Sequence, residues 1–367
     1  MEQKVITTGE INNAYEQFEQ CLMEKNCRKI LLVCGNSIRR LRLNDYFNTL
    51  EQRIGIQVIR FSDFQPNPTY DSVVKGVERF KGNHCDSIIA VGGGSAMDVA
   101  KCVKLYFNMD PSRSYLEQTI VPNDVKLITV PTTAGSGSEA TRYAVIYREG
   151  VKQSITDDSI IPSVVLLDAS LLKTLPDYQR KSAMLDAFCH AVESFWSINS
   201  TEESREYSRK AIKGILANKE QYLKNNDNAN AAMLMAAHEA GKAINIAQTT
   251  AGHAMCYKLT TLYGIAHGHA AALCVRELWP YMLKKVDCNI QNTFEDLAEA
   301  MQCADAKSAT RKFAEFFDSL GLSKPEPNEG DYNILCTSVN PERLRNNPIK
   351  LDYNAIDDLY HKILKKG

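Results

Sequence analysis

The 367-residue chain lacks the features that mark several classes of protein. Its 43 basic and 44 acidic residues leave a formal net charge of −1, which provides no bulk electrostatic attraction to nucleic acid or to an anionic membrane. No apolar run approaches the roughly 18 residues that a membrane span needs, and the first residues contain no apolar signal core. We therefore expect a cytoplasmic protein that binds neither nucleic acid nor a membrane.

Cysteine pairs at redox or zinc-binding spacing are also missing. The 11 cysteines are scattered without any CxxC pair, and several fall inside apolar segments, which favours reduced and mostly buried thiols. The sequence has no internal repeat, no low-complexity segment and no linker rich in Gly, Pro or Ser. A domain boundary must therefore be found from a change in the secondary-structure pattern.

Apolar segments predict two domains of different class. Short strands alternate with helices up to about residue 175, which is typical of a parallel sheet with helices on both faces. The expected elements there are strands Lys29–Val33, Gln57–Phe61, Ser87–Val91 and Leu127–Val130, a helix from the first strand to about Leu50, and helices Tyr70–Phe80 and Ala96–Leu105. Only helices follow, the clearest being Ala183–Trp196, Glu203–Ala217, Ala231–Ile244 and His253–Leu262. We expect an α/β domain over residues 1–175 and an all-α domain over residues 176–367.

Two loops after predicted strands are suited to phosphate. The first follows Val91 and consists of Gly92, Gly93, Gly94 and Ser95. Glycines let the backbone approach a phosphate, and the N–H groups at a helix start favour its charge. The second follows Val130 and contains the hydroxyl groups of Thr132, Thr133, Ser136 and Ser138, which can bind phosphate or sugar oxygens. The first loop by itself could be an ordinary turn, but the two together favour nucleotide binding by residues 1–175.

The helical half contains one carboxylate and three histidines at spacings that suit a divalent metal. Asp186 and His190 are four residues apart in a helical segment, so both side chains can leave one helix face toward one ion. His253 and His267 follow later in the chain. A mixed nitrogen and oxygen set from separate helices suits Zn²⁺ or Fe²⁺. Any one of the histidines could instead be a hydrogen-bonded core or surface residue.

The segments GGGSAMDVAK, PTTAGSGSE, DAFCHAVES and His253–His267 resemble the four signature stretches of the iron-containing (group III) alcohol dehydrogenases. This resemblance implies a Rossmann-like, dehydroquinate synthase-like α/β domain that binds NADP or NAD, and a homo-oligomer. It also implies that Fe²⁺, or Zn²⁺, is held by Asp186, His190, His253 and His267. Hydride would pass between the nicotinamide and a metal-polarised small aldehyde. The residues expected to bind the cofactor are Gly35, Asn36, Ser37, Gly92, Gly93, Gly94, Ser95, Asp98, Thr132, Thr133, Ser136 and Lys152.

Two departures from the common family pattern bear on chemistry. Tyr257 stands where the family often has a histidine near the nicotinamide, and we expect it to act at the catalytic site, either as a proton relay or as a pocket-filling aromatic. Residues 35–37 stand where NAD-using members often have an Asp. Small polar residues with Arg39 and Arg40 nearby favour the 2′-phosphate of NADP, although two solvated arginines beside an ordinary turn would look the same.

The substrate is indicated by local resemblance alone. The segments SFWSINSTEESREYSRKAI and SVNPERLRNNP resemble the phosphonoacetaldehyde reductase branch, which makes 2-hydroxyethylphosphonate, although that branch often has Gln in place of His190. Candidate cations for a phosphonate are Arg142, Lys258, Arg343 and Arg345. The alternatives are a general short-chain or butanol-type alcohol dehydrogenase, and a metal-dependent lyase of the dehydroquinate synthase type. Because that lyase uses Glu with two histidines, an Asp with three histidines favours oxidoreduction.

Overall fold

The computed structural model describes residues 3–8, 13–285 and 288–365. The chain divides into two compact units. Unit 1 comprises residues 1–133 and 137–175, and unit 2 comprises residues 134–136 and 176–367. Each unit is described by itself.

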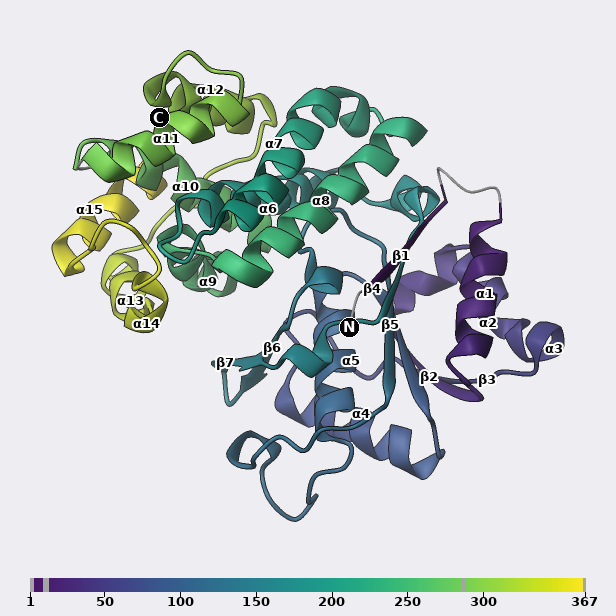
Figure 1. Cartoon of the computed structure of the whole chain (residues 1–367). Coiled ribbons are helices and arrows are strands. Elements are labelled where there is room, and N and C mark those ends of the chain that lie inside the picture. Colours follow the sequence, from purple (N-terminus) through teal and green to yellow (C-terminus); the bar gives the residue numbers. More distant parts are fainter. Residues whose placement is uncertain (1–2, 9–12, 286–287, 366–367) are drawn as a thin grey trace. The chain divides into compact units, whose positions relative to one another are not determined.

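Unit 1 is built on a six-stranded sheet in which every strand pair is parallel (Figure 1). Its strands, in the spatial order β1-β8-β5-β4-β2-β3, are β1 (Lys4–Thr7), β8 (Val164–Leu167), β5 (Lys126–Pro131), β4 (Ser87–Gly92), β2 (Lys29–Cys34) and β3 (Gln57–Phe61). Gly92 pairs with Pro131, and Cys34 pairs with Val91. The loops that follow β2, β4 and β5 therefore leave the same edge of the sheet side by side.

Helices cover both faces of this sheet, as the alternating pattern predicts. The bounds are α1 (Ala14–Glu24), α2 (Leu43–Asn48), α3 (Leu50–Ile54), α4 (Tyr70–Gly82) and α5 (Gly94–Tyr106). Successive strand residues point to opposite faces, so Ile88 and Ala90 pack with α4 and α5, whereas Ile89 and Val91 pack with α1 and α2. The predicted α/β class with a parallel sheet is confirmed.

Several elements of unit 1 differ from the sequence-based expectation. The helix expected between β2 and Leu50 is divided into the 3₁₀ segment η1 (Asn36–Arg40) and helix α2, because Leu41 between them is extended, with φ −106° and ψ 147°. The unexpected elements are α1, β1, β8 and the antiparallel hairpin of β6 (Tyr143–Arg148) and β7 (Val151–Thr156). The remaining short segments are η2 (Tyr115–Glu117), η3 (Ser138–Ala140), η4 (Asp158–Ile160) and η5 (Ala169–Thr174).

Unit 2 is helical throughout its regular structure, as predicted, with α6 at its centre (Figure 1). Its helices are α6 (Asp177–Trp196), α7 (Glu202–Leu223), α8 (Asp227–Ala247), α9 (Ala251–Tyr263), α10 (His267–Leu283), α11 (Cys288–Ala300), α12 (Ala306–Ser319), α13 (Asp331–Ser338), α14 (Pro341–Leu344) and α15 (Tyr353–Leu364). From Met184 to Trp196 every side chain of α6 is buried, because α7, α8 and α10 pack around it. Among the helices described, none has both the length and the apolar character needed to cross a membrane.

Candidate metal centre and cofactor-binding loops

Three helices of unit 2 bring the predicted carboxylate and histidines together. Asp186 and His190 lie one turn apart on α6, His253 lies in the first turn of α9, and His267 begins α10. Helix α10 packs against both α6 and α9. Residues separated by more than 60 positions in sequence therefore meet at one point of the unit.

The spacing of the ligand atoms suits a small ion. One oxygen of Asp186, Oδ1, lies 3.5 Å from His253 Nε2, 3.8 Å from His267 Nε2 and 3.9 Å from His190 Nε2. The ligand atoms of Asp186, His253 and His267 all lie within 4.8 Å of one another. Donors bound tetrahedrally at the usual metal distances are separated by roughly 3.4 Å, so these three groups need only small adjustments to surround one ion. His190 lies outside this group of three and approaches it only through Asp186.

Burial and charge provide a second test of whether a cation fits here. Asp186 Oδ1 and His253 Nε2 are both buried, and neither has a hydrogen-bond partner among the residues described. Burial alone would raise the pKa of Asp186, but the charges of His190 and His267 hold that pKa well below its usual range, so the carboxyl is ionised. A divalent cation would satisfy both unpaired atoms. The side chain of His267 is 38% exposed, which leaves one side of the cluster open.

A further carboxylate, which sequence reasoning did not single out, lies behind the cluster. Glu193 is fully buried on α6, and its Oε2 is hydrogen-bonded to Nδ1 of His253. Its Oε1 accepts hydrogen bonds from the Thr250 hydroxyl at 2.6 Å and the Thr250 N–H at 3.1 Å. The available signal was its position three residues after His190 on the same helix.

Tyr257 and Arg343 lie beside the same cluster. The Tyr257 ring stacks on His267 with centroids 5.5 Å apart and an interplanar angle of 20°. The guanidinium carbon of Arg343 lies 5.8 Å from the centre of the Tyr257 ring, at cation–π distance. His269 lies two residues after His267 but has other contacts. Its Nδ1 is hydrogen-bonded to the Tyr178 hydroxyl at 3.2 Å, and burial lowers the pKa of His269 to about 4.

The starts of the two phosphate-suited loops, after β4 and after β5, are in close contact. A Cβ on Gly92, whose φ is +156°, would lie 2.8 Å from the Cβ of Ala96, so the turn into α5 is too tight for a side chain. A Cβ on Gly93 would lie 3.3 Å from the hydroxyl oxygen of Thr133. The N–H of Thr132 donates to the carbonyl of Gly92 at 3.0 Å. Backbone N–H groups and hydroxyls from both loops can therefore serve one phosphate group.

The other predicted cofactor residues lie in four places, one of which is strand β7, where Lys152 is found. Gly35, Asn36 and Ser37 start η1 at the carboxyl end of β2, with Asn36 and Ser37 exposed. Asp98 on α5 accepts a hydrogen bond from the Ser138 hydroxyl at 3.4 Å; burial raises the pKa of Asp98 to about 7, against the opposing charges of Lys101 and Lys152. Ser136 belongs to the short segment assigned to unit 2.

Lys101 was not singled out by the sequence reasoning, yet it organises the end of the second loop. Its ammonium group is fully buried and donates to the carbonyls of Ser138 at 2.7 Å, Thr141 at 2.8 Å and Tyr143 at 2.8 Å. These bonds fix η3 against α5. Its position in the GGGSAMDVAK segment was the only sequence signal.

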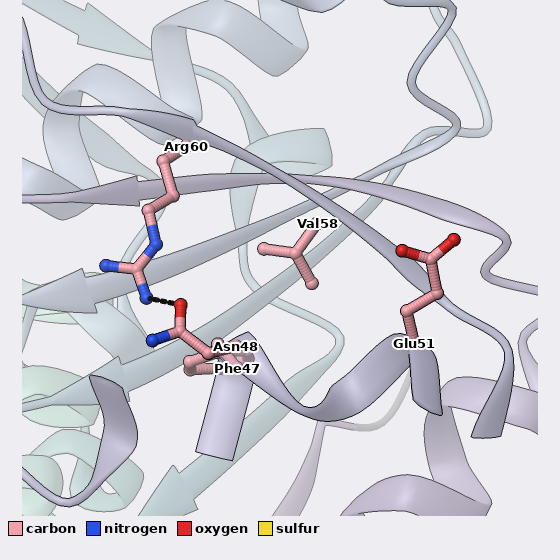
Figure 2. Close-up of a pocket in the computed structure, with 5 residues that line it drawn as sticks. All are labelled: Phe47, Asn48, Glu51, Val58 and Arg60. Atoms are coloured by element: carbon pink, nitrogen blue, oxygen red, sulfur yellow. Dashed lines mark hydrogen bonds between the residues drawn. The ribbon is translucent and has the colours of Figure 1, made fainter. Parts of the chain in front are cut away.

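A surface hollow in unit 1 contains none of these residues. It has a volume of about 130 Å³ and is lined by Phe47, Asn48, Glu51, Val58 and Arg60. Figure 2 shows the Arg60 guanidinium turned toward Asn48, to whose side-chain oxygen it donates at 2.8 Å. The Arg60 guanidinium, which is the charged donor of the hollow, is therefore already paired.

A parallel α/β unit with phosphate-suited loops, followed by a helical unit with a carboxylate and histidine cluster, is the arrangement expected of a metal-dependent dehydrogenase or of a lyase with the same fold. The model of the iron-containing alcohol dehydrogenases matches residues 6–169, and the model of the C-terminal part of the Fe-containing alcohol dehydrogenase family matches residues 181–364. The chain therefore belongs to the iron-containing alcohol dehydrogenase family and is an NAD(P)-linked oxidoreductase. The resemblance inferred from the sequence is confirmed.

Named relatives differ in their substrates. The chain is 31% identical to the phosphonoacetaldehyde reductase of Streptomyces viridochromogenes, over 79% of this chain and 79% of that protein. It is 28% identical to the NADPH-dependent butanol dehydrogenase of Clostridium saccharobutylicum, over 72% of this chain and 69% of that protein. The crystal structure of a sulfoacetaldehyde reductase from Bifidobacterium kashiwanohense in complex with NAD⁺ is 23% identical, with a TM-score of 0.89 over 100% of this chain and 98% of that chain. That last likeness shows the fold.

Proposed function

We propose that this protein is a metal-dependent, NADPH-linked reductase of a small aldehyde that carries an anionic group, with phosphonoacetaldehyde as the substrate and 2-hydroxyethylphosphonate as the product. Asp186, His190, His253 and His267 hold Fe²⁺ or Zn²⁺. The observation that carries the metal-dependent part is the approach of three histidine Nε2 atoms to one oxygen of Asp186. Family membership favours oxidoreduction over the lyase alternative.

At these residues Fe²⁺ or Zn²⁺ would supply a Lewis acid for the carbonyl of the aldehyde. Asp186 contributes the negative charge that balances a divalent cation in a buried place. His267 is the most exposed of the four side chains, so substrate approaches from its side. Tyr257 lines that side through its stacking on His267, where its hydroxyl is a candidate to pass a proton to the product oxygen.

NADPH binds through unit 1. The N–H groups at the start of α5 and the hydroxyl of Thr133 bind the pyrophosphate, because Gly92 and Gly93 allow the backbone to approach it. The segment after β2 contains Asn36 and Ser37 and no acidic side chain, so a 2′-phosphate meets no like charge there. The exposed Arg39 and Arg40 in the same segment are available to pair with it.

Arg343 is the cation that supports an anionic substrate. Of the four cations considered, Arg142 is paired with Asp158 at 3.1 Å in unit 1, and Arg345 is exposed. Lys258 is half-buried on α9 and stays a second candidate. Arg343 lies over Tyr257, which in turn stacks on His267. A guanidinium is a cation suited to binding a phosphonate, and the cation–π contact with Tyr257 places that of Arg343 beside the cluster. The relative that is named a phosphonoacetaldehyde reductase supports the same substrate class.

The first test compares substrates with Fe²⁺-loaded protein prepared without oxygen. Oxidation of NADPH is followed with phosphonoacetaldehyde and with propanal and butanal as uncharged controls. We expect kcat/KM to favour the phosphonate by a hundredfold or more, which corresponds to about 2.7 kcal/mol. Equal or faster rates with propanal and butanal would leave a general short-chain alcohol dehydrogenase, the alternative that the sequence left open.

Arg343→Ala provides the second test. Loss of a charge-assisted hydrogen bond costs about 1.5–3 kcal/mol, so we expect kcat/KM for phosphonoacetaldehyde to fall by tenfold to a hundredfold. The value for propanal should fall far less. Arg345→Ala, which removes an exposed charge two residues away, is the matched control. An equal loss for both aldehydes would mean that Arg343 supports the protein and does not select the substrate.

A further inference from the structure

The carboxylate of Glu193 lies directly behind one of the proposed metal ligands. We infer that Glu193 is a positioning residue, which fixes the ring of His253 so that its Nε2 presents a lone pair to the metal. This inference rests on the proposed metal site of the preceding section. It concerns a residue outside the four proposed ligands.

Glu193 joins helix α6 to the first turn of α9. Besides the two Thr250 donors, its Oε1 lies 3.3 Å from the N–H of His253. The Thr250 hydroxyl also accepts a hydrogen bond from the Trp196 indole at 2.9 Å, so the proton of that hydroxyl is the one given to Glu193. The first N–H groups of a helix have no partner within the helix and attract negative charge. Glu193 thus satisfies the start of α9 with one buried carboxylate.

The same carboxylate determines which nitrogen of His253 carries a proton. Three donors converge on Oε1, as expected of an ionised carboxylate, which only accepts hydrogen bonds. Oε2 then accepts the proton on Nδ1 of His253. In a neutral imidazole the other nitrogen, Nε2, must carry the lone pair. That nitrogen is the one that faces Asp186 Oδ1 at 3.5 Å.

The surrounding packing leaves little freedom to this pair. A Cβ on Gly252 would lie 3.0 Å from Oε1 of Glu193 and 2.6 Å from Cγ2 of Val275, so a larger residue would displace the carboxylate. His190 stacks on His253 with centroids 4.6 Å apart and an interplanar angle of 17°. The two rings therefore restrict each other's tilt. Nδ1 of His267 has a weaker hydrogen-bond partner than Nδ1 of His253, namely the thiol of Cys256 at 3.6 Å.

The experiment measures metal affinity without turnover. Co²⁺ is used as the probe, its dissociation constant is found by competition with a chromophoric chelator, and its absorption spectrum reports ligand geometry. Removing an outer carboxylate partner of a metal-bound histidine typically weakens affinity about 10- to 100-fold. We expect Glu193→Gln to weaken Co²⁺ binding in that range and to change the spectrum, while the metal-free protein keeps its circular dichroism. Glu277→Gln, which removes a carboxylate further along α10, should bind as the wild type does.

The variants separate the two proposals. If the wild type binds no Co²⁺, or if Asp186→Asn binds it as tightly as the wild type, the proposed metal site is wrong. If Asp186→Asn loses the metal and Glu193→Gln retains the affinity and spectrum of the wild type, only the positioning role of Glu193 is overturned. Should Glu193→Gln fail to fold, Thr250→Val removes one anchor of the same carboxylate. We expect that variant to weaken Co²⁺ binding several-fold, and an unchanged affinity would overturn the inference.

Discussion

At the scale of single residues, three buried carboxylates have different surroundings, which indicate what each of them does. Asp186 lies among histidine nitrogens and has an oxygen without a hydrogen bond among the described residues, as expected of a cation ligand. Glu193 is saturated by donors from α9. Asp168 receives its donors from three different segments of unit 1. Asp186 is thus suited to bind a cation, Glu193 to orient His253, and Asp168 to stabilise the fold of unit 1.

Asp168→Asn is therefore expected to reduce stability in a pH-dependent way. Asp168 is fully buried and accepts from the Tyr15 hydroxyl at 2.5 Å, Arg42 Nη2 at 2.6 Å and the N–H of Ser170 at 3.0 Å. Burial would raise its pKa, but the hydrogen bonds from Tyr15 and Arg42 hold that pKa below its usual value. Because the folded-state pKa is the lower one, the contribution is present above about pH 4 and is lost as the pH falls further.

We expect the variant to lower the free energy of unfolding by about 2 kcal/mol at pH 7, with little of this from Arg42, whose side chain is 54% exposed. Urea unfolding at pH 7 and at pH 3.5 measures the difference from wild type, which should shrink in acid. Asp158→Asn, which changes an exposed ion pair, is the control and should alter stability by less than about 0.5 kcal/mol. A difference that is the same at both pH values would contradict the argument.

The sequence predicted the four proposed ligands, and it singled out Tyr257 and Arg343 beside them, but not the residues behind His253. Asp186 and His190 could be paired because their spacing places them on one helix face, and family resemblance supplied His253 and His267. The roles of Thr250 and Gly252 depend on how closely α9 approaches α6. No local pattern in the sequence encodes that distance. The ligand roles themselves remain predictions until metal binding is measured.

At the scale of helices and strands, the grouping of Asp186 with the histidines depends on how closely α10 approaches α6. A Cβ on Gly268 would lie 2.1 Å from the carbonyl oxygen of Ser182 and 2.6 Å from the Cβ of Asp186. The next N–H, that of His269, donates to the Ser182 hydroxyl at 3.1 Å. A glycine between the two histidines therefore lets the start of α10 lie directly on the α6 backbone.

Gly268→Ala is expected to separate these helices. Overpacking of this kind costs about 1–3 kcal/mol, and the shift should also move His267 away from Asp186 and weaken Co²⁺ binding. Thermal unfolding of the metal-free protein and a Co²⁺ titration measure the two effects. Gly82→Ala, at the end of α4, is the control, because a Cβ there meets nothing within 4 Å. Normal stability and metal affinity in Gly268→Ala would show that α10 tolerates displacement.

The strands with continuous apolar character could be predicted almost to the residue, since burial on both faces leaves an unbroken pattern. Strands β2 and β4 are each one residue longer than predicted. The edge strand β3 has the predicted bounds, although it is only partly buried. The hairpin of β6 and β7 was missed because its two-residue turn, Glu149–Gly150, has positive φ at both positions, 53° and 76°. Glu is not among the residues that favour such a turn. Strand β1 is only four residues long and depends on pairing with the distant β8.

At the scale of the whole molecule, the two units are expected to respond to different ligands. The loop after β4 and residues Thr132 and Thr133 lie in unit 1, whereas residues 134–136 and the side chains proposed to bind the metal lie in unit 2. A ligand that binds only the folded state stabilises it by about 2.7 kcal/mol at a hundred times its dissociation constant. The local part of that stabilisation appears as slower amide hydrogen exchange where the ligand binds.

Removal of the metal should therefore have a defined pattern along the chain. We expect chelation to speed hydrogen exchange in α6, α9 and the start of α10. The three helices then lose the cation that joins their side chains, and the ligand atoms that it held together are no longer neutralised. Exchange in β4 and β5 should not change. NADPH should instead slow exchange in the loop after β4 and in the first turn of α5. Mass spectrometry of peptides from protein with Zn²⁺, without metal, and with NADPH measures all three states. If chelation left α6 and α9 unchanged and altered unit 1, the cluster around Asp186 would not be where the metal binds, and the proposed chemistry would have to be sought at another site.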